Sequence, residues 1–544
     1  MSADGHFRVP KPYNEPVRAY EPGSPHRASL KARLAELTDA RTEIPMVIGG
    51  ERRNGGQPGS LTAPHRHELV IAEYAIGKPP DVKAAIEAAL AARAAWARTP
   101  FEARAAVFLR AAALLAGPWR DTVNAATMLG QSKTAHQAEI DAACELIDFW
   151  RYNAFFADEL LAQQPANDAT AWNRLEYRPL EGFVFAVTPF NFTSIMGNLP
   201  TAPALLGNVV VFKPATQTLL AAHFLMRLLE EAGLPPGVIN LVSGSAAEIS
   251  EQVLAHPDLA GIHFTGSTGV FHEMWKRVGQ RIDGYRSYPR LVGETGGKDF
   301  VVAHESADVA ALRTALVRGA FEYQGQKCSA ASRAYVPAAM WKSLQPELAA
   351  EVDGIRQGDV ADFRNFMGAV IDRGAFEKHR AAIEFARTSK EARIIAGGET
   401  DDSVGWFVRP TVVETTDPGF RLLKEELFGP ILTVYPYPDG RFEETLDLCD
   451  RTSPYGLTGA VFATDRSAIT LAADKLRNAA GNFYVNDKPT GAVVGLQPFG
   501  GGRASGTNDK AGSFLNLIRW ISARAIKETY VPPADYRYPF MAEE

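Results

Sequence analysis

Short apolar runs alternate with helical patterns along most of the chain, and this order predicts an α/β fold. Residues 183–187 and 209–212 are continuously apolar, and residues 218–232 repeat apolar positions at helical spacing. Strands that are apolar on both faces and joined through helices are typical of a parallel sheet covered on both sides. A second α/β run starts at Arg290 and continues to the stretch "TGAVFAT". Such sheets bind ligands at the carboxyl ends of their strands.

The first third of the chain predicts mainly helices. The alanine-rich residues 80–117 contain two amphipathic patterns that divide near Thr99-Pro100. Residues 134–156 predict a third helix, and Glu145 lies in an otherwise apolar part of it, which favours an inward position. The neighbouring acids are expected to mark a solvated face; they are Glu139, Asp141 and Asp148.

Three segments outside these patterns are expected on the surface. Residues 1–26 contain five prolines, which exclude a long helix, and Ser24-Pro25 then opens a helix. Residues 169–181 alternate in polarity and predict a hairpin that leaves the main body. The C-terminal tail, residues 523–544, is rich in proline and tyrosine, and we expect it to dock on a partner subunit.

The composition excludes several classes of protein. With 544 residues, 46% hydrophobic and 22% charged, the chain is expected to form two or three globular domains. A net charge of −6 offers no basic excess for nucleic acid. Three cysteines cannot form a disulfide framework, and no apolar run reaches the roughly 18–20 residues of a membrane span. No secretory signal precedes residue 26. We therefore expect a cytoplasmic protein.

Cys328 stands apart from the other cysteines because it lies between small and polar residues, in Gly-Gln-Lys-Cys-Ser-Ala. A thiolate in such a loop can attack a carbonyl carbon, and uncrowded backbone N–H groups can hold the resulting oxyanion. The alternative is a small buried hydrophobic residue, which is the more common fate of a free cysteine. Cys144 and Cys449 lie in helical patterns and fit that alternative.

Five further loops carry polar or aromatic groups after strand-like runs. The Asn191 amide suits an oxyanion, the Lys213 ammonium suits a ribose or phosphate oxygen, and Ser267 after Gly266 suits a pyrophosphate. A desolvated Glu294 suits a general base, and Glu426 with Phe428 suits a ribose and a planar ring. Each also has a structural explanation: turn geometry for Asn191, a snorkelling Lys213, a simple turn at Ser267, a Glu294–Lys298 pair and a core Phe428.

Together and in this order, these motifs resemble the aldehyde dehydrogenase superfamily over residues 45–525. Three stretches look like its L-glutamate γ-semialdehyde (1-pyrroline-5-carboxylate) dehydrogenase branch: "AEIDAACELIDFWRYN", "PFNFTSI" and "TGAVVGLQPFGGGRASGTNDKAG". The resemblance implies two parallel-sheet α/β domains, one for NAD and one catalytic, plus a small β oligomerisation flap. It also implies NAD-dependent oxidation of glutamate semialdehyde to glutamate in proline breakdown, by a monofunctional enzyme.

The resemblance implies roles for individual residues. Cys328 is then the nucleophile, Asn191 with the Cys328 N–H forms the oxyanion hole, and Glu294 activates water. The residues that resemble the NAD site are Pro189, Lys213, Gly266, Ser267, Glu426 and Phe428. For the substrate, Glu145 would meet the ammonium group. The carboxylate would be held by Ser329, Gly491 and Ala492, between the aromatic walls Phe192 and Phe499. No metal is implied.

The resemblance also implies a division of the chain. The expected parts are residues 1–40, an arm and first helix; 41–163 and 184–290, the NAD-binding domain; 164–183 and 515–544, an oligomerisation hairpin and tail; and 291–514, the catalytic domain. We expect a homo-oligomer of at least two subunits. A transient contact with a separate proline dehydrogenase is left open.

Several alternatives remain at this point. Another short semialdehyde, such as succinic semialdehyde, is disfavoured by Glu145, and a CoA-acylating enzyme by Glu294. A nucleotide-binding protein with an inactive site is disfavoured because Cys328, Asn191 and Glu294 occur together. A cysteine hydrolase would need a histidine partner, and His263 precedes its loop. Thr216 stands where many NAD-preferring relatives carry an acid, so some use of NADP stays open, and Thr295 replaces a common leucine.

Overall fold

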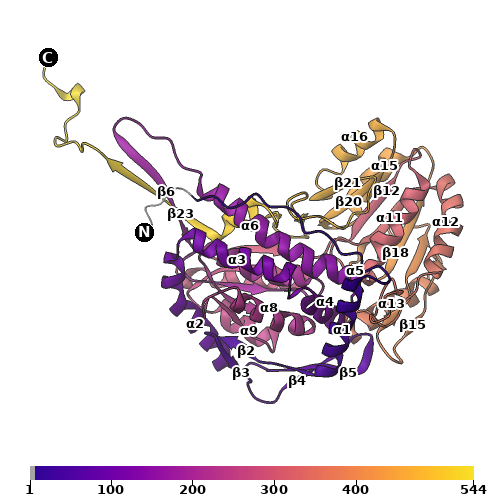
Figure 1. The fold of residues 1–544 in the computed structure, drawn as a ribbon. Helices are drawn as coiled ribbons and strands as arrows, with labels where there is room; N and C mark the ends of the chain where they lie inside the picture. The colour runs from indigo at the N-terminus through magenta and orange to yellow at the C-terminus, as the bar shows by residue number, and fades with distance from the viewer. Residues whose placement is uncertain (1–6) are drawn as a thin grey trace.

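The computed structural model describes residues 7–544 and places most strands in two seven-stranded sheets (Figure 1). The first sheet has the spatial order β11 (Arg290–Glu294), β10 (Leu259–Thr265), β7 (Phe183–Val187), β8 (Val209–Lys213), β9 (Ile239–Leu241), β2 (Met46–Ile48) and β3 (Glu51–Arg53). The second has the order β14 (Ala392–Ala396), β17 (Thr411–Thr415), β18 (Ile431–Tyr437), β13 (Ala331–Pro337), β12 (Asp299–Ala303), β20 (Thr458–Phe462) and β21 (Asn482–Val485). Antiparallel pairing is confined to β2 and β3 in the first sheet and β14 in the second, which confirms the predicted α/β class.

Helices pack against both sheets. Those of the first half are α1 (Pro25–Ala40), α2 (Pro79–Arg98), α3 (Phe101–Ala116), α4 (Arg120–Gln131), α5 (Ala135–Ala138), α6 (Glu145–Leu161), α7 (Thr193–Leu205), α8 (Leu219–Glu231), α9 (Ala246–Leu254) and α10 (Thr268–Gln280). Those of the second half are α11 (Val309–Phe321), α12 (Ala338–Asp353), α13 (Arg373–Thr388), α14 (Arg421–Lys424), α15 (Phe442–Thr452), α16 (Arg466–Lys475) and α17 (Phe514–Leu517). The predicted break near residue 100 is confirmed between α2 and α3. Within residues 7–544, no helix is both long and apolar enough to cross a membrane.

Smaller sheets accompany the two large ones. One has three strands, in the order β1 (Thr42–Ile44), β5 (Arg66–Tyr74) and β4 (Gly59–Ala63). Two others have two strands each: β15 (Thr400–Asp401) with β16 (Phe407–Val408), and β19 (Tyr455–Gly456) with β22 (Gly502–Arg503). The third predicted helix is interrupted: a π-helical segment, Glu139–Cys144, joins α5 to α6. Such segments inside α-helices are frequent at functional sites.

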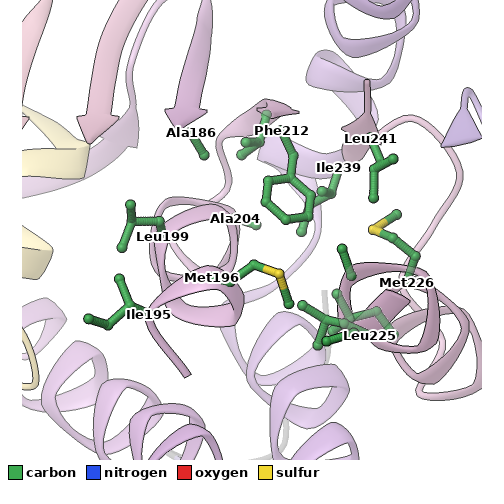
Figure 2. Packing of buried hydrophobic residues seen from close by; sticks show 14 of the residues in the cluster. Ala186, Ile195, Met196, Leu199, Ala204, Phe212, Leu225, Met226, Ile239 and Leu241 are labelled. Carbon is green, nitrogen blue, oxygen red and sulfur yellow. The ribbon is translucent and has the colours of Figure 1, made fainter. Parts of the chain in front are cut away.

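The core of the first half lies between its sheet and the helices. Figure 2 shows Met196 of α7 directly below the ring of Phe212 of β8, with Leu225 of α8 next to Met196. All five residues of β8 are buried, because helices cover both faces of the sheet. Burying one such large apolar side chain contributes about 1.5–3 kcal/mol, which explains why continuously apolar runs form the central strands.

The predicted hairpin over residues 169–181 is wrong. This segment forms a single strand, β6 (Ala171–Pro179), which pairs antiparallel with β23 (Ile521–Thr529) near the other end of the chain. Together they form a two-stranded ribbon that projects from the body (Figure 1). The alternating pattern indicated a strand correctly, but alternation does not specify the partner of a strand.

The second α/β run does not begin at Arg290. Strand β11 pairs parallel with β10 and so completes the first sheet. The second sheet begins at β12, after the boundary at residue 291 that the sequence predicted. The two strands are separated by only four residues, so Glu294 ends one sheet just before the chain enters the other. The other domain limits stay predictions.

The arm before α1 is extended, as predicted, in residues 7–24; its first six residues lie outside the described part of the chain. In space the arm runs along α6, because the Val9 N–H donates to Asp158 and the Glu15 N–H donates to Asp148 of that helix. The Ser24 hydroxyl then accepts from the Arg27 N–H and caps α1, which confirms the predicted helix start.

The side chain of Asn208 connects the base of the ribbon to the first sheet, and we expect its hydrogen bonds to contribute to the free energy of unfolding. Its buried amide donates to the carbonyls of Pro203 and Trp520 at 2.9 and 2.8 Å, and accepts from the Leu180 N–H at 2.9 Å. Asn208→Ala should lower the free energy of unfolding by about 2–4 kcal/mol, because it leaves these groups buried without partners. Chemical denaturation would measure this against Asn54→Ala, an exposed control. A loss no larger than that of the control would contradict the prediction.

Candidate active site

Strand pairing brings the predicted cofactor residues to one edge of the first sheet. The end of β7 pairs with Lys213 at the end of β8, and Thr265 at the end of β10 pairs with Glu294 at the end of β11. Strands β7 and β10 are themselves neighbours. The loops that carry Pro189 and Gly266 follow these ends directly, so they lie at the same edge.

Two features of this edge suit an anionic or polyhydroxyl ligand. Lys213 is only 8% exposed, and burial lowers the pKa of its ammonium group. In the part of the chain that the structure describes, this ammonium has no hydrogen-bond or ion-pair partner. The Ser267 hydroxyl accepts from the Val270 N–H at 3.4 Å and caps α10, whose N-terminal N–H groups favour an anion.

Cys328 lies in a buried loop beside Asn191. The loop enters through Tyr323 and Gln324, whose φ angles of 51° and 55° are left-handed. The Asn191 amide nitrogen donates to the Gln326 carbonyl at 3.1 Å, which holds Asn191 against this loop. The structure therefore brings together two residues that are far apart in the sequence and were predicted to act on the same oxyanion.

Gly297 allows the loop after Glu294 to touch the loop of Cys328. A Cβ atom at Gly297 would lie 2.0 Å from the Cys328 carbonyl oxygen and 2.1 Å from a carboxylate oxygen of Asp299. Only glycine fits such a close approach. The contact places the end of the first sheet directly against the nucleophile candidate of the second.

The Glu294 carboxylate is desolvated, as the sequence predicted. Its Oε1 is buried, and no partner for it occurs among residues 7–544. Burial raises the pKa of Glu294 to about 8, with Lys510 lowering it and Asp509 raising it by smaller amounts. The alternative explanation, a Glu294–Lys298 pair, does not hold, since the buried Lys298 Nζ also has no partner among these residues. A carboxyl group with this pKa changes its charge near neutral pH.

Burial also raises the pKa of the Cys328 thiol well above its usual value, and the nearby Glu294, Asp299 and Glu426 carboxylates raise it further. At neutral pH the thiol is therefore protonated. Attack on a carbonyl carbon requires this proton to leave as the carbon–sulfur bond forms.

Glu426 is already engaged by the backbone. Its carboxylate accepts hydrogen bonds from three backbone N–H groups. These are the N–H of Lys298, that of Gly297 at 3.1 Å and that of Phe428 at 2.9 Å. Phe428 has a left-handed φ of 59°, and its ring meets Phe190 edge to face at 5.7 Å. The carboxylate thus ties the loops of both sheets together, and a ribose hydroxyl would bind through its remaining lone pairs.

A cavity of about 220 Å³ lies beside Cys328, and every residue that was predicted to bind substrate lines it. These residues are Glu145, Phe192, Ser329, Gly491, Ala492 and Phe499. The Ser329 hydroxyl hydrogen-bonds to the Thr490 hydroxyl at 2.8 Å. Phe149 and Ile195 complete the apolar walls. The cavity is thus apolar along its sides and polar at particular points, which is typical of a small-molecule site.

Glu145 points into this cavity, which explains its apolar sequence context. Its carboxylate accepts from the Ser194 hydroxyl at 2.9 Å. Burial, and to a smaller extent the neighbouring Asp141, raise the pKa of Glu145 to about 8, although Ser194, Lys133 and Lys327 lower it. A cationic ligand would stabilise the ionised form of this carboxylate.

The expected solvated face of the third helix is wrong. Glu139, Asp141 and Asp148 are 0%, 3% and 4% exposed. Asp141 lies 2.7 Å from the ammonium of Lys133 and 3.7 Å from that of Lys327. These buried pairs were missed because a charge in a helical pattern gives no sign of a partner outside the helix, whether it is as near in the sequence as Lys133 or as remote as Lys327.

The N-terminal arm is the second feature that sequence analysis missed. Asn14, Glu15 and Val17 line the cavity that contains Cys328. Nothing in a proline-rich segment indicates the surface on which it will lie, and no chemical motif marks these residues.

The comparisons with known proteins agree with this geometry. A model of the "Aldehyde dehydrogenase family" matches residues 53–521. The chain is 50% identical to the mitochondrial delta-1-pyrroline-5-carboxylate dehydrogenase of Dictyostelium discoideum over 546 residues, 100% of this chain and 98% of the relative. It is also 50% identical to the protein of that name from Bos taurus over 529 residues, 97% of this chain and 94% of the relative. A crystal structure of the Delta-pyrroline-5-carboxylate dehydrogenase from Mycobacterium tuberculosis bound with NAD matches with a TM-score of 0.96 at 57% identity, covering 99% of this chain and 100% of that one. The chain therefore belongs to the aldehyde dehydrogenase family.

Proposed function

We propose that the chain oxidises L-glutamate γ-semialdehyde, which is in equilibrium with 1-pyrroline-5-carboxylate, to L-glutamate with NAD. The observation that carries this proposal is the cavity with Cys328 at one point of its wall and the desolvated Glu145 carboxylate at another. An aldehyde that also carries an ammonium and a carboxylate group needs both an anionic partner and several N–H or O–H donors. The names of the relatives support the same substrate.

The proposed reaction uses the thiol as a nucleophile. The Cys328 thiol gives its proton to water as its sulfur attacks the aldehyde carbon, while the Asn191 amide and the Cys328 N–H stabilise the negative charge that develops on oxygen. When bound, NAD supplies the acceptor for the hydride that leaves this carbon. A thioester on Cys328 results. Glu294 then takes a proton from water, which attacks the thioester and releases the carboxylate and the free thiol.

The residues at the edge of the first sheet fit NAD. Lys213 provides a buried ammonium that lacks a protein partner in the described chain, which suits ribose hydroxyls. Ser267 and Gly266 stand at the N-terminus of α10, which suits the pyrophosphate. Glu426 and Phe428 lie at the loop that meets Cys328, which suits the nicotinamide half. Pro189 would complete the wall of the adenosine side.

We also propose a homo-oligomer of at least two subunits. The ribbon projects from the body, and its tail exposes large aromatic residues: Tyr530, Tyr536, Tyr538 and Phe540. Such clustered apolar groups favour burial against another subunit.

The cytoplasmic location predicted from the sequence stays a prediction, since the names of both relatives described above include "mitochondrial". A transient contact with a separate proline dehydrogenase also stays untested.

NADH absorbance tests the proposed function directly. We expect strong turnover of pyrroline-5-carboxylate with NAD, weaker turnover of succinic semialdehyde and propanal, and weaker use of NADP. Cys328→Ala should abolish NADH formation while NAD binding, followed by calorimetry, survives. Equal rates for all aldehydes would contradict the substrate, and turnover by Cys328→Ala would contradict the nucleophile.

Glu294→Gln should slow the release of product more than the formation of NADH. A rapid burst of NADH followed by a slow steady state in stopped-flow absorbance would show this, because Glu294 acts as the base only in the second step, whereas water accepts the thiol proton in the first. In the wild type the steady-state rate should rise between pH 7 and 9, since a carboxyl with a pKa of about 8 becomes ionised over that range. The variant should lose this rise. An undiminished steady-state rate would exclude Glu294 as the base.

Glu145→Gln should raise the KM for pyrroline-5-carboxylate about tenfold or more, and that for propanal much less, because only the first substrate has an ammonium group. Tenfold corresponds to about 1.4 kcal/mol, which is within the range of a charge-assisted hydrogen bond. Glu159→Gln, an exposed position on the same helix, provides the matched control. Equal changes for both aldehydes would show that Glu145 does not recognise the ammonium.

A further inference from the structure

The cavity is bounded by two elements that are distant in sequence and are connected by the N-terminal arm. One is α6, which begins with Glu145, and the other is the loop that contains Gly491 and Ala492. The proposed function assigns the substrate ammonium to the first and the substrate carboxylate to the second. An amino-acid aldehyde can be held at both ends only when the distance between these elements is fixed.

Asn14 joins these two elements through one side chain. Its amide nitrogen donates to the Asp148 carboxylate of α6 at 2.9 Å and to the Val494 carbonyl at 2.8 Å. Its amide oxygen accepts from the Tyr152 hydroxyl of α6 at 3.1 Å. Both donors and the acceptor of the side chain are therefore used. Asp148 lies about one helical turn after Glu145, and Val494 lies three residues after Gly491.

The packing around Asn14 supports the same connection. A Cβ atom at Gly495 would lie 2.1 Å from the Tyr152 ring, so the loop reaches α6 closely only because this residue is glycine. The next residue of the arm is also fixed: the Glu15 N–H donates to Asp148 at 2.7 Å, and its carboxylate pairs with Arg151 at 2.8 Å and with Arg120. The arm is thus anchored by Glu15 directly after Asn14, and by the Val9 N–H, which donates to Asp158 of α6, before it.

We propose that Asn14 is a positioning residue for substrate specificity, whose amide fixes the separation between Glu145 and the Gly491-Ala492 loop. This inference rests on the proposed function, since it assumes that these two elements hold the two charged ends of the substrate. The arm would then do more than line the outer wall of the cavity, because it would also set the distance between the two groups that hold the substrate. Aldehydes without the two charged groups depend on this separation much less.

The test compares kcat/KM for pyrroline-5-carboxylate and for propanal in the wild type and in four variants. Asn14→Ala removes all three hydrogen bonds. Asn14→Asp keeps the size of the side chain but removes both donors and places a carboxylate against Asp148. Tyr152→Phe removes only the bond to the amide oxygen. Lys11→Ala, an exposed position in the same arm, is the matched control.

We expect Asn14→Ala and Asn14→Asp to lower kcat/KM for pyrroline-5-carboxylate about tenfold more than for propanal, mainly through KM, which corresponds to about 1.4 kcal/mol. Tyr152→Phe should shift the same ratio in the same direction by a smaller factor, and Lys11→Ala should leave it at the wild-type value. Thermal melting with and without NAD reports whether each variant is folded. If either Asn14 variant does not fold, the other and Tyr152→Phe still decide the outcome.

The inference is overturned if the folded Asn14 variants keep the wild-type ratio, or if both aldehydes lose activity equally. An Asn14→Asp protein that behaves like the wild type would overturn it too, because the side chain would then act only by filling space. Failure of the proposed function is a separate result: it would appear as a wild-type enzyme without preference for pyrroline-5-carboxylate.

Discussion

The close approach at Gly297 is the constraint on which the arrangement of the site depends. The chain leaves the first sheet at Glu294 and enters the second at Asp299, and between them it must pass against the Cys328 carbonyl. Glu426 holds this crossing through the N–H groups of Gly297 and Lys298. Because one short segment carries the base candidate Glu294 and touches the loop of Cys328, the carboxyl-end edge of the first sheet and the nucleophile candidate of the second are held at a fixed separation. A side chain at Gly297 would force the two halves apart.

The electrostatics of the site follow from the same crowding. Glu294, Asp299 and Cys328 are all removed from water, and burial raises the pKa of each. Burial therefore favours the neutral form of each of these groups. Lys133 and Lys327 lie 2.7 and 3.7 Å from the buried Asp141 carboxylate, and Asp141 and Lys327 line the same cavity as Cys328. The cavity wall thus combines acids whose neutral form is favoured by burial with a buried carboxylate that has two ammonium partners.

Much of this fold was predictable because burial of a strand or helix determines its pattern of apolar and polar residues. Strands β7, β8 and β10 are buried at nearly every position, so their continuous apolar runs identified them, and the polar residues that follow them identified the ligand edge. Pairing and side-chain partners were not predictable in this way. The partner of β6 comes from the opposite end of the chain, and β11 joins the sheet before it. Asp141 and Asp148 lie in a helical pattern that is the same whether they face water or a lysine or asparagine from a remote segment. Asn14 belongs to an arm whose path is fixed only by tertiary contacts.

The pairing of β6 with β23 has a consequence for the order of folding. Arg174 donates a hydrogen bond across the ribbon to Glu528, which is 354 positions away in the sequence. During synthesis from the N-terminus, β6 emerges long before its partner and presents unpaired N–H and C=O groups in the meantime. Such a non-local pair forms late, after the first sheet can already be complete. The projecting ribbon, and any assembly built on it, is therefore available only once nearly the whole polypeptide has left the ribosome.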